Sequence, residues 1–311
     1  MDDELLSVRV AELYYDAGKT QDEIGALLDI SRFKVGRLLT RARESGIVRI
    51  EIVHPRARRL ALERALAERY PRLTGAVVVP AGDDADLLDR VAQAAADHLR
   101  ALRPLPHTLG VSWGRTLTAV AAHLPDGWAR GVTVVQVNGG VSVNRRRGGA
   151  AQVAATIAER AAVQAVLLPS PAILEQEETA RAIQNDRTVA SVLALAARAD
   201  AAVFSAGVCD ETSAHVENGY LDVDGIHRLR QRGAVGDVLG RYIDAEGNVV
   251  DPALDARTVG MPLTRLRAQD QAIFVTAGRA KHSLARTVVG TGLCTVIVTD
   301  EHTAHALLED A

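Results

Sequence analysis

The sequence predicts an α/β protein of two domains: a small helical domain at residues 1–54 and a large domain at 73–311 with a doubly wound, mostly parallel sheet. In the first 45 residues, helix-capping signals mark two short helices around a tight turn. From residue 74 onward, short apolar runs alternate with helical patterns, which is typical of strands joined by helices. Between the domains, residues 55–72 form an amphipathic pattern bracketed by Pro55 and Pro71, which predicts a linker helix.

The composition is that of an ordinary globular protein. Of 311 residues, 48% are hydrophobic and 24% are charged, and no apolar run approaches the ~18 residues of a membrane helix. The acidic start Met1–Glu4 is unlike a signal or transit peptide, so we expect a cytoplasmic protein. The only cysteines are Cys209 and Cys294, and the histidines at 107, 123, 215 and 227 lack ligand spacing. We therefore expect no disulfide framework, no metal and no cofactor.

Positive charge is concentrated near the N-terminus although the whole chain carries a net charge of −3. Residues 31–59 hold nine basic and two acidic side chains, a surplus of seven positive charges. A basic island on an acidic protein is the electrostatic footprint of a nucleic-acid-binding segment. Charge alone leaves a solvated basic helix as the alternative.

The small domain has three predicted helices. The first carries an apolar face and ends at Ala17-Gly18, where glycine can supply a left-handed cap. Thr20 and Glu23 have the spacing of a capping box for a second helix through Leu28. Asp29-Ile30 makes the turn, and Ser31 caps a third helix that runs to about Glu44 and is ended by Gly46. Residues 47–53 then alternate between apolar and polar residues, which predicts a strand. The expected buried positions are Ile24, Leu28, Ile30, Val35 and Leu38, with Gly25 where the helices come closest.

Two helices around a tight turn, on a basic segment, predict a helix-turn-helix that binds double-stranded DNA. The third helix is expected to present five residues to the major groove: Ser31, Arg32, Lys34, Val35 and Arg37. Arginine can pair with guanine, while serine and lysine more often hold phosphates. Gln21 is placed to contact the DNA backbone. A three-helix unit used only for protein contacts is the alternative.

The large domain shows seven apolar runs with the character of buried parallel strands, at 76–80, 108–112, 132–138, 165–169, 201–205, 273–277 and 295–299. Helical patterns lie between them, at 87–102, 117–124, 152–162, 188–199 and 281–289. Ligands of such sheets bind at the carboxyl ends of the strands, beside helix N-termini. The turns that follow the strands are therefore the candidate site.

Several of these turns carry glycine and polar residues. Residues 110–116 end one strand and open a helix, so backbone N–H groups with Ser112 or Thr116 could hold a phosphate. Asn138, Gly139 and Gly140 follow the next strand, and 205–208 follow another. Residues 233–244 form a loop punctuated by glycine that carries Asp237 and Arg241, and 276–281 place Lys281 in the first turn of a helix.

In their order along the chain, these motifs resemble the SorC family of sugar-sensing bacterial transcriptional regulators. The motifs are Thr20-Gln-Asp-Glu-Ile24, Ile30-Ser-Arg32, Gly46-Ile-Val48, Gly110-Val-Ser-Trp-Gly114, Gln136-Val-Asn-Gly-Gly140, Gly233-Ala-Val-Gly-Asp237, Arg257-Thr-Val-Gly260 and Val298-Thr-Asp-Glu301. The resemblance covers essentially the whole chain. It implies an effector domain similar to sugar-phosphate isomerases and deaminases, a homo-oligomer that is commonly a tetramer, and effectors that are sugars, sugar phosphates or polyols.

The resemblance also assigns roles to residues. Ser112, Gly114, Arg115 and Thr116 resemble a phosphate-facing loop, although related members often have a small or hydroxylated residue where Arg115 stands. Asn138 resembles a position where some members carry a lysine that forms a Schiff base, so reversible, noncovalent binding is expected here. The remaining expected effector contacts are Gly139, Gly140, Gln152, Asp237 and Lys281.

The alternatives are structural. Asp237 could cap its own loop, Lys281 could be a surface cation, Gln152 could have no part in the site, and Arg145–Arg147 could be a solvated loop.

The functional expectation is a regulator that binds operator DNA under the control of a sugar-like effector, without catalytic residues. The alternative is a sugar-phosphate isomerase, deaminase or lyase that carries a DNA-binding head. Its fold would be the same, so the fold cannot decide between them. Catalysis would need a base paired with a second acid or nucleophile. Asp237 and Lys281 could supply these groups, but the sequence shows no Asp/His/Glu constellation that completes a catalytic site.

Overall fold

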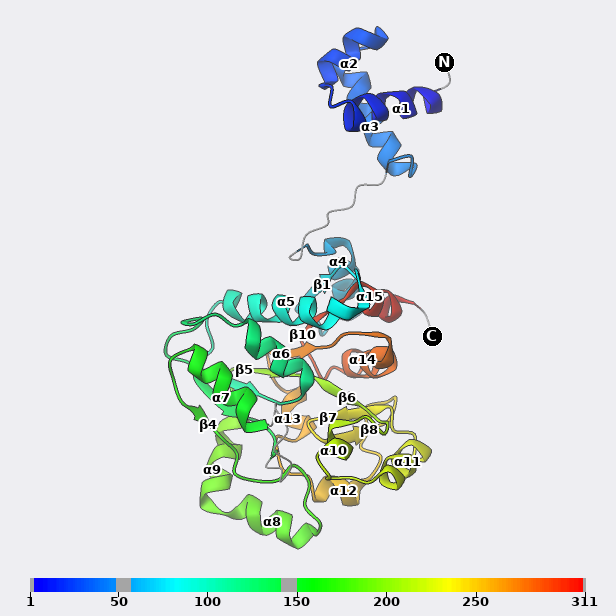
Figure 1. Cartoon of the computed structure of the whole chain (residues 1–311). Helices are drawn as coiled ribbons and strands as arrows, with labels where there is room; N and C mark the ends of the chain where they lie inside the picture. The colour runs from blue at the N-terminus through cyan, green and yellow to red at the C-terminus, as the bar shows by residue number, and fades with distance from the viewer. Residues whose placement is uncertain (1–2, 49–56, 141–149, 310–311) are drawn as a thin grey trace. The chain divides into compact units, whose positions relative to one another are not determined.

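The computed structural model describes residues 3–48, 57–140 and 150–309, and its contacts divide the chain into two compact units, Met1–His54 and Pro55–Ala311 (Figure 1). Most of the strand expected at 47–53 and all of Arg145–Arg147 lie outside the described residues. Within the described part, no helix is both long and apolar enough to span a membrane.

The first unit packs its helices around one small apolar core. The elements are α1 (Asp3–Ala11), the π-helical turn η1 (Glu12–Asp16), α2 (Gln21–Leu28) and α3 (Arg32–Glu44). The core contains Leu6, Val10, Leu13, Ile24, Val35, Leu38 and Leu39, with Leu28 and Ile30 packed against it. All five apolar positions expected from the sequence therefore lie in or against this core.

The ends of α2 and α3 follow the expected capping chemistry. The Glu23 backbone N–H donates to Thr20 Oγ1 at 3.3 Å, and the Thr20 N–H donates to Glu23 Oε2 at 2.8 Å, which completes the capping box. Ser31 accepts from the Lys34 N–H at 3.2 Å and begins α3.

Between the helices, Asp29 adopts the left-handed conformation with φ of 53°. A Cβ on Gly25 would lie 2.7 Å from the Ile30 carbonyl oxygen, so only glycine lets the turn pack this closely.

The second unit is built on a seven-stranded sheet in the order β1-β10-β9-β5-β2-β3-β4, with every pair parallel. The strands are β1 (Gly75–Val79), β2 (Thr108–Val111), β3 (Thr133–Gln136), β4 (Ala165–Val166), β5 (Ala201–Phe204), β9 (Ala272–Val275) and β10 (Val296–Asp300). Each of the seven apolar runs forms one of these strands, which confirms the predicted doubly wound, mostly parallel sheet.

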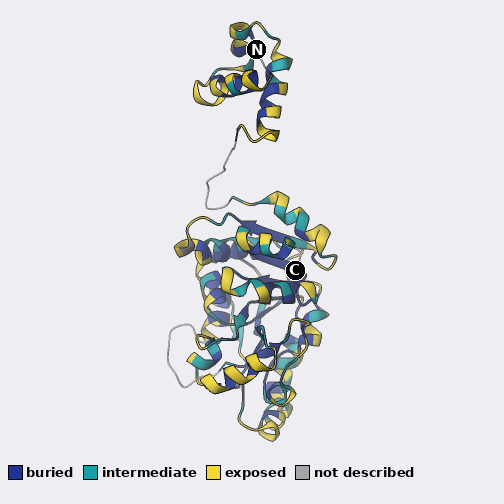
Figure 2. Cartoon of the chain, turned by 90° about the vertical axis from the view of Figure 1, so that its right-hand side faces the viewer, coloured by how far each residue is buried: buried dark blue, intermediate teal, exposed yellow. Residues whose placement is uncertain are grey.

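Helices cover both faces of this sheet (Figure 1). The elements are α4 (Leu60–Arg69), η2 (Asp84–Asp86), α5 (Leu87–Ala101), α6 (Arg115–His123), α7 (Ala150–Arg160), α8 (Glu177–Asn185), α9 (Arg187–Ala196), α10 (Ala214–Glu217), α11 (Val223–Gln231), α12 (Pro252–Ala256), α13 (Leu263–Arg267), η3 (Arg279–Lys281), α14 (His282–Gly290) and α15 (Glu301–Leu308). Alternate residues of a strand point to opposite faces. In β1, Val77 and Val79 join the core beneath α5, α6 and α7, while Ala76 and Val78 join the core beneath α4, α9, α14 and α15. The strands are accordingly buried, and exposed residues lie on the outer sides of the helices (Figure 2).

The linker segment expected at 55–72 contributes α4, which packs against β1 and α15 of the large unit. Its Leu66 is fully buried, whereas Leu60 is exposed. Of the apolar side expected at Leu60, Leu62, Leu66 and Ala67, only Leu66 and the half-buried Leu62 pack against the core, while Leu60 and Ala67 are exposed.

A second sheet was not expected from the sequence. Strands β6 (Ala206–Val208), β7 (Gly236–Val238) and β8 (Arg241–Ile243) form a three-stranded antiparallel sheet directly after β5. The interpretation of residues 233–244 as a loop is therefore wrong. β7 and β8 are joined by the two-residue turn Leu239-Gly240, with φ of 54° and 85°. Positive φ at both central residues is the geometry of the two-residue hairpin turns that match the twist of paired strands.

Candidate functional site

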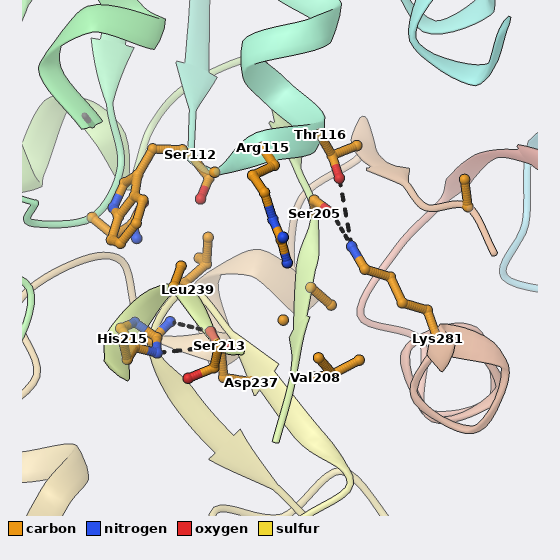
Figure 3. Close-up of a pocket in the computed structure, with 18 of the residues that line it drawn as sticks. Ser112, Arg115, Thr116, Ser205, Val208, Ser213, His215, Asp237, Leu239 and Lys281 are labelled. Atoms are coloured by element: carbon orange, nitrogen blue, oxygen red, sulfur yellow. Dashed lines mark hydrogen bonds and ion pairs between the residues drawn. The ribbon is translucent and has the colours of Figure 1, made fainter. Parts of the chain in front are cut away.

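The order of the parallel strands places a topological switch point between β2 and β5. From β2 the chain proceeds to β3 and β4 on one side, whereas from β5 it proceeds to β9 and β10 on the other. At such a point the connections leave toward opposite faces and open a crevice at the carboxyl ends of the strands. A cavity of about 280 Å³ lies there, lined by the loops after β2, β5 and β9, by the small antiparallel sheet and by α10 (Figure 3).

The loop after β2 brings hydroxyl groups and one cation to the cavity. Ser112 and Thr116 are buried, and Gly114 adopts φ of 127° at the start of α6. The start of α6 leaves backbone N–H groups that favour a negatively charged ligand. The exposed Arg115 points into the cavity in Figure 3 and has no ion-pair partner among the described residues. This loop therefore offers N–H groups, hydroxyls and a guanidinium to an anion.

Lys281 approaches the same region from the loop after β9. Its Nζ lies 3.3 Å from Ser205 Oγ and 3.5 Å from Thr116 Oγ1, so its described hydrogen-bond partners are both hydroxyls (Figure 3). The pKa of Lys281 is lowered to about 8, mainly by burial; Asp237 opposes this shift and the nearby Arg115 adds to it. An amine that is poorly hydrated and unpaired with a carboxylate binds an anionic group readily, because the anion restores the lost solvation.

Asp237 lies on β7, and its carboxylate is held by the hairpin. The Gly240 backbone N–H donates to Oδ2 at 3.0 Å across the turn. A Cβ on Gly207, the β6 partner of Asp237, would lie 2.2 Å from Oδ1, so glycine at 207 makes room for the carboxylate. Burial raises the pKa of Asp237, and His215, the Gly240 N–H and Lys281 oppose that rise. Asp237 thus caps its own turn and also faces the cavity.

His215 completes this side of the cavity and was missed by sequence reasoning. It is buried on α10, with Nδ1 at 3.0 Å from the Tyr242 hydroxyl and 3.7 Å from Asp237 Oδ1. Its ring meets Trp113 edge to face at a centroid distance of 5.9 Å. Ser213, which caps α10, also lines the cavity. The sequence could not link α10 to the hairpin, because the two come together only in the folded structure.

A chain of contacts connects the Lys281 loop with the first described residues of the large unit. Asp300, at the end of β10, accepts from the Gly278 N–H at 3.0 Å. The next residue, Glu301, accepts from Arg59 Nε at 2.9 Å and from the Ala81 N–H at 3.3 Å. The Arg59 N–H in turn donates to Val78 on the sheet edge at 2.8 Å. The cavity loop and the segment that follows residue 56 therefore share one network.

In the first unit, the residues expected to contact DNA differ in how exposed they are. Ser31, Arg32 and Arg37 are exposed, and Gln21 and Lys34 are half-buried. Val35 is fully buried in the core, so its assignment as a groove contact is wrong. Val35 shares the inner face of α3 with Leu38, Leu39 and Ala42, three, four and seven residues further on. Arg32 lies 3.4 Å from Asp22 in an exposed ion pair.

Both the large unit and the whole chain resemble known proteins. The family described as "Putative sugar-binding domain" matches residues 54–309. The deoxyribonucleoside regulator of Bacillus subtilis is 31% identical over 306 residues, which cover 98% of this chain and 97% of that protein. The structure of the full-length sorbitol operon regulator SorC from Klebsiella pneumoniae matches with a TM-score of 0.73 and 28% identity, covering 99% of this chain and 100% of that one.

The chain belongs to the SorC family. The erythritol catabolism regulatory protein EryD of Brucella abortus is a further relative, 26% identical over 310 residues that cover 98% of this chain and 97% of that protein. These relatives are named as regulators, and the matched domain is a sugar-binding one. The resemblance to the SorC family and the predicted fold class are thereby confirmed.

Most of the site residues suggested by the SorC family resemblance meet at the cavity. Ser112, Gly114, Arg115, Thr116, Asn138, Asp237 and Lys281 all line it. The Asn138 side chain is buried, and its Oδ1 has no hydrogen-bond partner in the described structure, so its capacity to accept a hydrogen bond is unused.

The other three suggested residues lie outside the lining of this cavity. The Gly139 carbonyl accepts from Trp113 Nε1 at 2.9 Å, and a Cβ on Gly139 would lie 2.2 Å from the Pro171 carbonyl oxygen. The Gly140 N–H donates to the Ser170 carbonyl at 2.9 Å. Gln152 is exposed on α7. The two glycines therefore fix the backbone that carries Asn138.

Proposed function

We propose that this chain is a bacterial transcriptional regulator. The unit Met1–His54 binds double-stranded operator DNA through a helix-turn-helix made of α2 and α3. The cavity of the large unit binds a sugar, a sugar phosphate or a polyol, reversibly and noncovalently, and this binding controls the affinity for DNA. Because operator DNA in a bacterium lies in the cytoplasm, the protein acts there.

The observation that carries the effector proposal is the division of the cavity into two ends of different chemistry. One end offers Arg115, Lys281 and two hydroxyls, the set that suits a phosphate or carboxylate. The other end offers the Asp237 carboxylate and the free Asn138 carbonyl oxygen, which accept from hydroxyl groups. A small polyhydroxylated anion matches both ends at once.

The DNA proposal is supported by the capped pair of helices and by the charge beside it. Helix α3 leaves Arg37, Arg41 and Arg43 exposed on one surface. Because recognition helices place their N-terminal residues against bases and hold phosphates with flanking cations, this surface suits the major groove. We infer a homo-oligomer, a tetramer as is common in the SorC family, since such readers bind two half-sites through a symmetric assembly.

The effector proposal is tested by a thermal-shift screen of the full chain against paired free and phosphorylated sugars and polyols. A ligand at about 100 times its Kd stabilises the unit that binds it by about 2.7 kcal/mol, which is readily seen. Shifts confined to phosphorylated compounds would support the Arg115–Lys281 end as a phosphate site. Shifts from free polyols alone would refute that phosphate site, and no shift from any compound would refute the effector proposal.

The DNA proposal is tested by selecting bound duplexes from a random library with the full chain. We expect a recurring site whose affinity falls steeply with salt, because each neutralised phosphate releases counterions. The variant Arg37→Ala should lose about 1–3 kcal/mol of binding free energy if this arginine contacts a base. Recovery of unrelated sequences only would contradict sequence-specific binding.

The His215–Asp237 pair, 3.7 Å apart in the cavity, favours a second candidate, an enzyme of the sugar-phosphate isomerase or deaminase type with a DNA-binding head. A buried acid and base could transfer a proton during catalysis. In this chain, however, His215 Nδ1 also contacts the Tyr242 hydroxyl, and Asp237 Oδ2 holds the hairpin turn. Turnover of a sugar phosphate that Asp237→Asn abolishes would favour the enzyme.

A further inference from the structure

The first turn of α3 carries an apolar side chain that the core does not use. Phe33 is 86% exposed, the most exposed of the large hydrophobic residues that the structure describes. It is the second residue of α3, directly after the Ser31 cap and Arg32. Removing an apolar ring of this size from water is favourable, so this ring is a strong candidate for burial against a partner.

The geometry of α3 places Phe33 on the face opposite the core. Residues three, four and seven positions apart lie on one face of a helix, so Phe33 shares its face with Gly36, Arg37 and Thr40. The inner face holds Val35, Leu38, Leu39 and Ala42. A Cβ on Gly36 would meet only the Gln21 side chain, at 3.5 Å. Because Gly36 itself has no side chain, a partner can approach the helix backbone beside Phe33. Because helical side chains lean toward the N-terminus, the ring extends toward the end of α3 that enters a groove.

The charge around Phe33 identifies the partner. The hollow beside the ring is lined by Arg32, Arg37, Arg41 and Arg43, with Glu44 as its single acidic residue. A second copy of this unit placed face to face would bring the same arginines together, and like charges across an interface are unfavourable. A duplex with its phosphates meets the arginines with opposite charge.

Resting on the proposed function of this unit, we infer that Phe33 contacts the C5 methyl group of a thymine in the major groove of the operator. A phenyl ring has no hydrogen-bonding group, and the thymine methyl is the apolar feature that the major groove presents. Arg37, one turn further on the same face, then reaches the neighbouring base or phosphate. Phe33 therefore takes the apolar role in specificity that buried Val35 cannot fill.

The test removes only the methyl group. After a bound site has been selected with the full chain, each thymine of one half-site is replaced in turn by deoxyuridine. The Kd of a labelled duplex is then measured by fluorescence anisotropy at one fixed salt concentration. For the wild-type chain we expect one replacement to raise the Kd about three- to fivefold, which corresponds to about 0.8 kcal/mol for one methyl group withdrawn from an apolar contact.

The matched variants are Phe33→Ala and Leu27→Ala, since Leu27 is also exposed but lies on α2. In Phe33→Ala the thymine and deoxyuridine duplexes should bind equally at that position, with the salt dependence unchanged, whereas Leu27→Ala should keep the wild-type difference. The inference is overturned if the selected site holds no thymine, if the wild type tolerates deoxyuridine at every position, or if Phe33→Ala keeps the methyl effect. A wild-type chain that selects no site would instead refute the DNA proposal itself, and the Phe33 inference with it.

Discussion

Raising the pH from 7 to 9 should weaken the binding of a phosphorylated sugar through the titration of Lys281. Burial lowers the pKa of this amine to about 8 in the free protein, and an anionic ligand favours the charged form, which raises the pKa in the complex. The protein should therefore bind the phosphorylated sugar most tightly below about pH 7, and the affinity should fall as the pH rises through 8 toward the pKa of Lys281 in the complex.

The magnitude follows from the fraction of Lys281 that carries a charge. With a pKa of about 8, roughly nine-tenths of the free protein is protonated at pH 7 and roughly one-tenth at pH 9. The Kd should thus rise about tenfold over this range, equivalent to about 1.4 kcal/mol. The phosphate itself contributes little, because its second pKa of about 6 lies below the range.

The assay is isothermal titration calorimetry of the full chain at pH 7, 8 and 9 and constant ionic strength, with the phosphorylated compound that gives the largest thermal shift. Lys281→Arg is the matched control, since arginine stays charged at every pH used. Its Kd should be independent of pH even if its affinity is lower. A wild-type Kd that stays constant from pH 7 to 9, or a Lys281→Arg Kd that still rises, would refute the role given to the amine.

Three further variants probe the rest of the chain. Asp237→Asn keeps an oxygen for the hairpin turn but loses a charged acceptor worth about 1.5–3 kcal/mol. We expect the ligand Kd to rise at least about tenfold, with an unchanged or higher Tm because a buried charge is gone; a large fall in Tm would show that the carboxylate is structural. Gly25→Ala places a Cβ against the Ile30 carbonyl and should destabilise the first unit by about 1–3 kcal/mol. It should lower the Tm of the first unit and weaken operator binding but leave the ligand Kd unchanged, and an unchanged Tm with unimpaired operator binding would contradict the packing described. Glu301→Gln removes the ion pair with Arg59. If this network carries the effect of ligand binding to the first unit, the variant should bind the ligand with the wild-type Kd, but the ligand should change its operator Kd less than in the wild type. A ligand effect on the operator Kd as large as in the wild type would exclude the network.

The parallel sheet could be predicted from the sequence because its strands are continuous apolar runs. A run such as 132–138 is rich in valine, is buried on both faces, and is bounded by residues that end strands. The capped helices of the first unit were equally predictable, since Thr20, Glu23 and Ser31 act within their own helical turns. Local chemistry decides both kinds of element.

The antiparallel hairpin could not be predicted in the same way. β7 and β8 have three residues each, and their turn uses Leu239 with a positive φ that sequence rules reserve mainly for glycine and asparagine. Such short strands depend on tertiary pairing with β6. The error at Val35 has a related cause: a residue in the first turn of α3 was assigned outward by its position in the motif, while its spacing from Leu38 and Ala42 places it inward.

Those residues of the candidate site that directly follow parallel strands could be predicted, because ligands bind at the carboxyl ends of such strands. Ser112, Thr116 and Lys281 each follow a parallel strand, and the structure brings them to one cavity. His215 lies on α10 and Ser213 caps it; the position of this helix does not follow from the ends of the parallel strands, and only the three-dimensional arrangement places both residues beside Asp237.

The central claim is that a ligand in the cavity of one unit changes the DNA affinity of the other. It is tested most directly by the Kd of the full chain for its selected operator, measured by fluorescence anisotropy with and without saturating ligand. Coupling of about 1–3 kcal/mol is typical, so we predict a change of about 5- to 150-fold in the wild type. At a ligand concentration equal to the wild-type ligand Kd, the change in Asp237→Asn should be much smaller than in the wild type, while its ligand-free operator Kd is unaltered. An operator Kd that saturating ligand leaves unchanged in the wild type would contradict the claim.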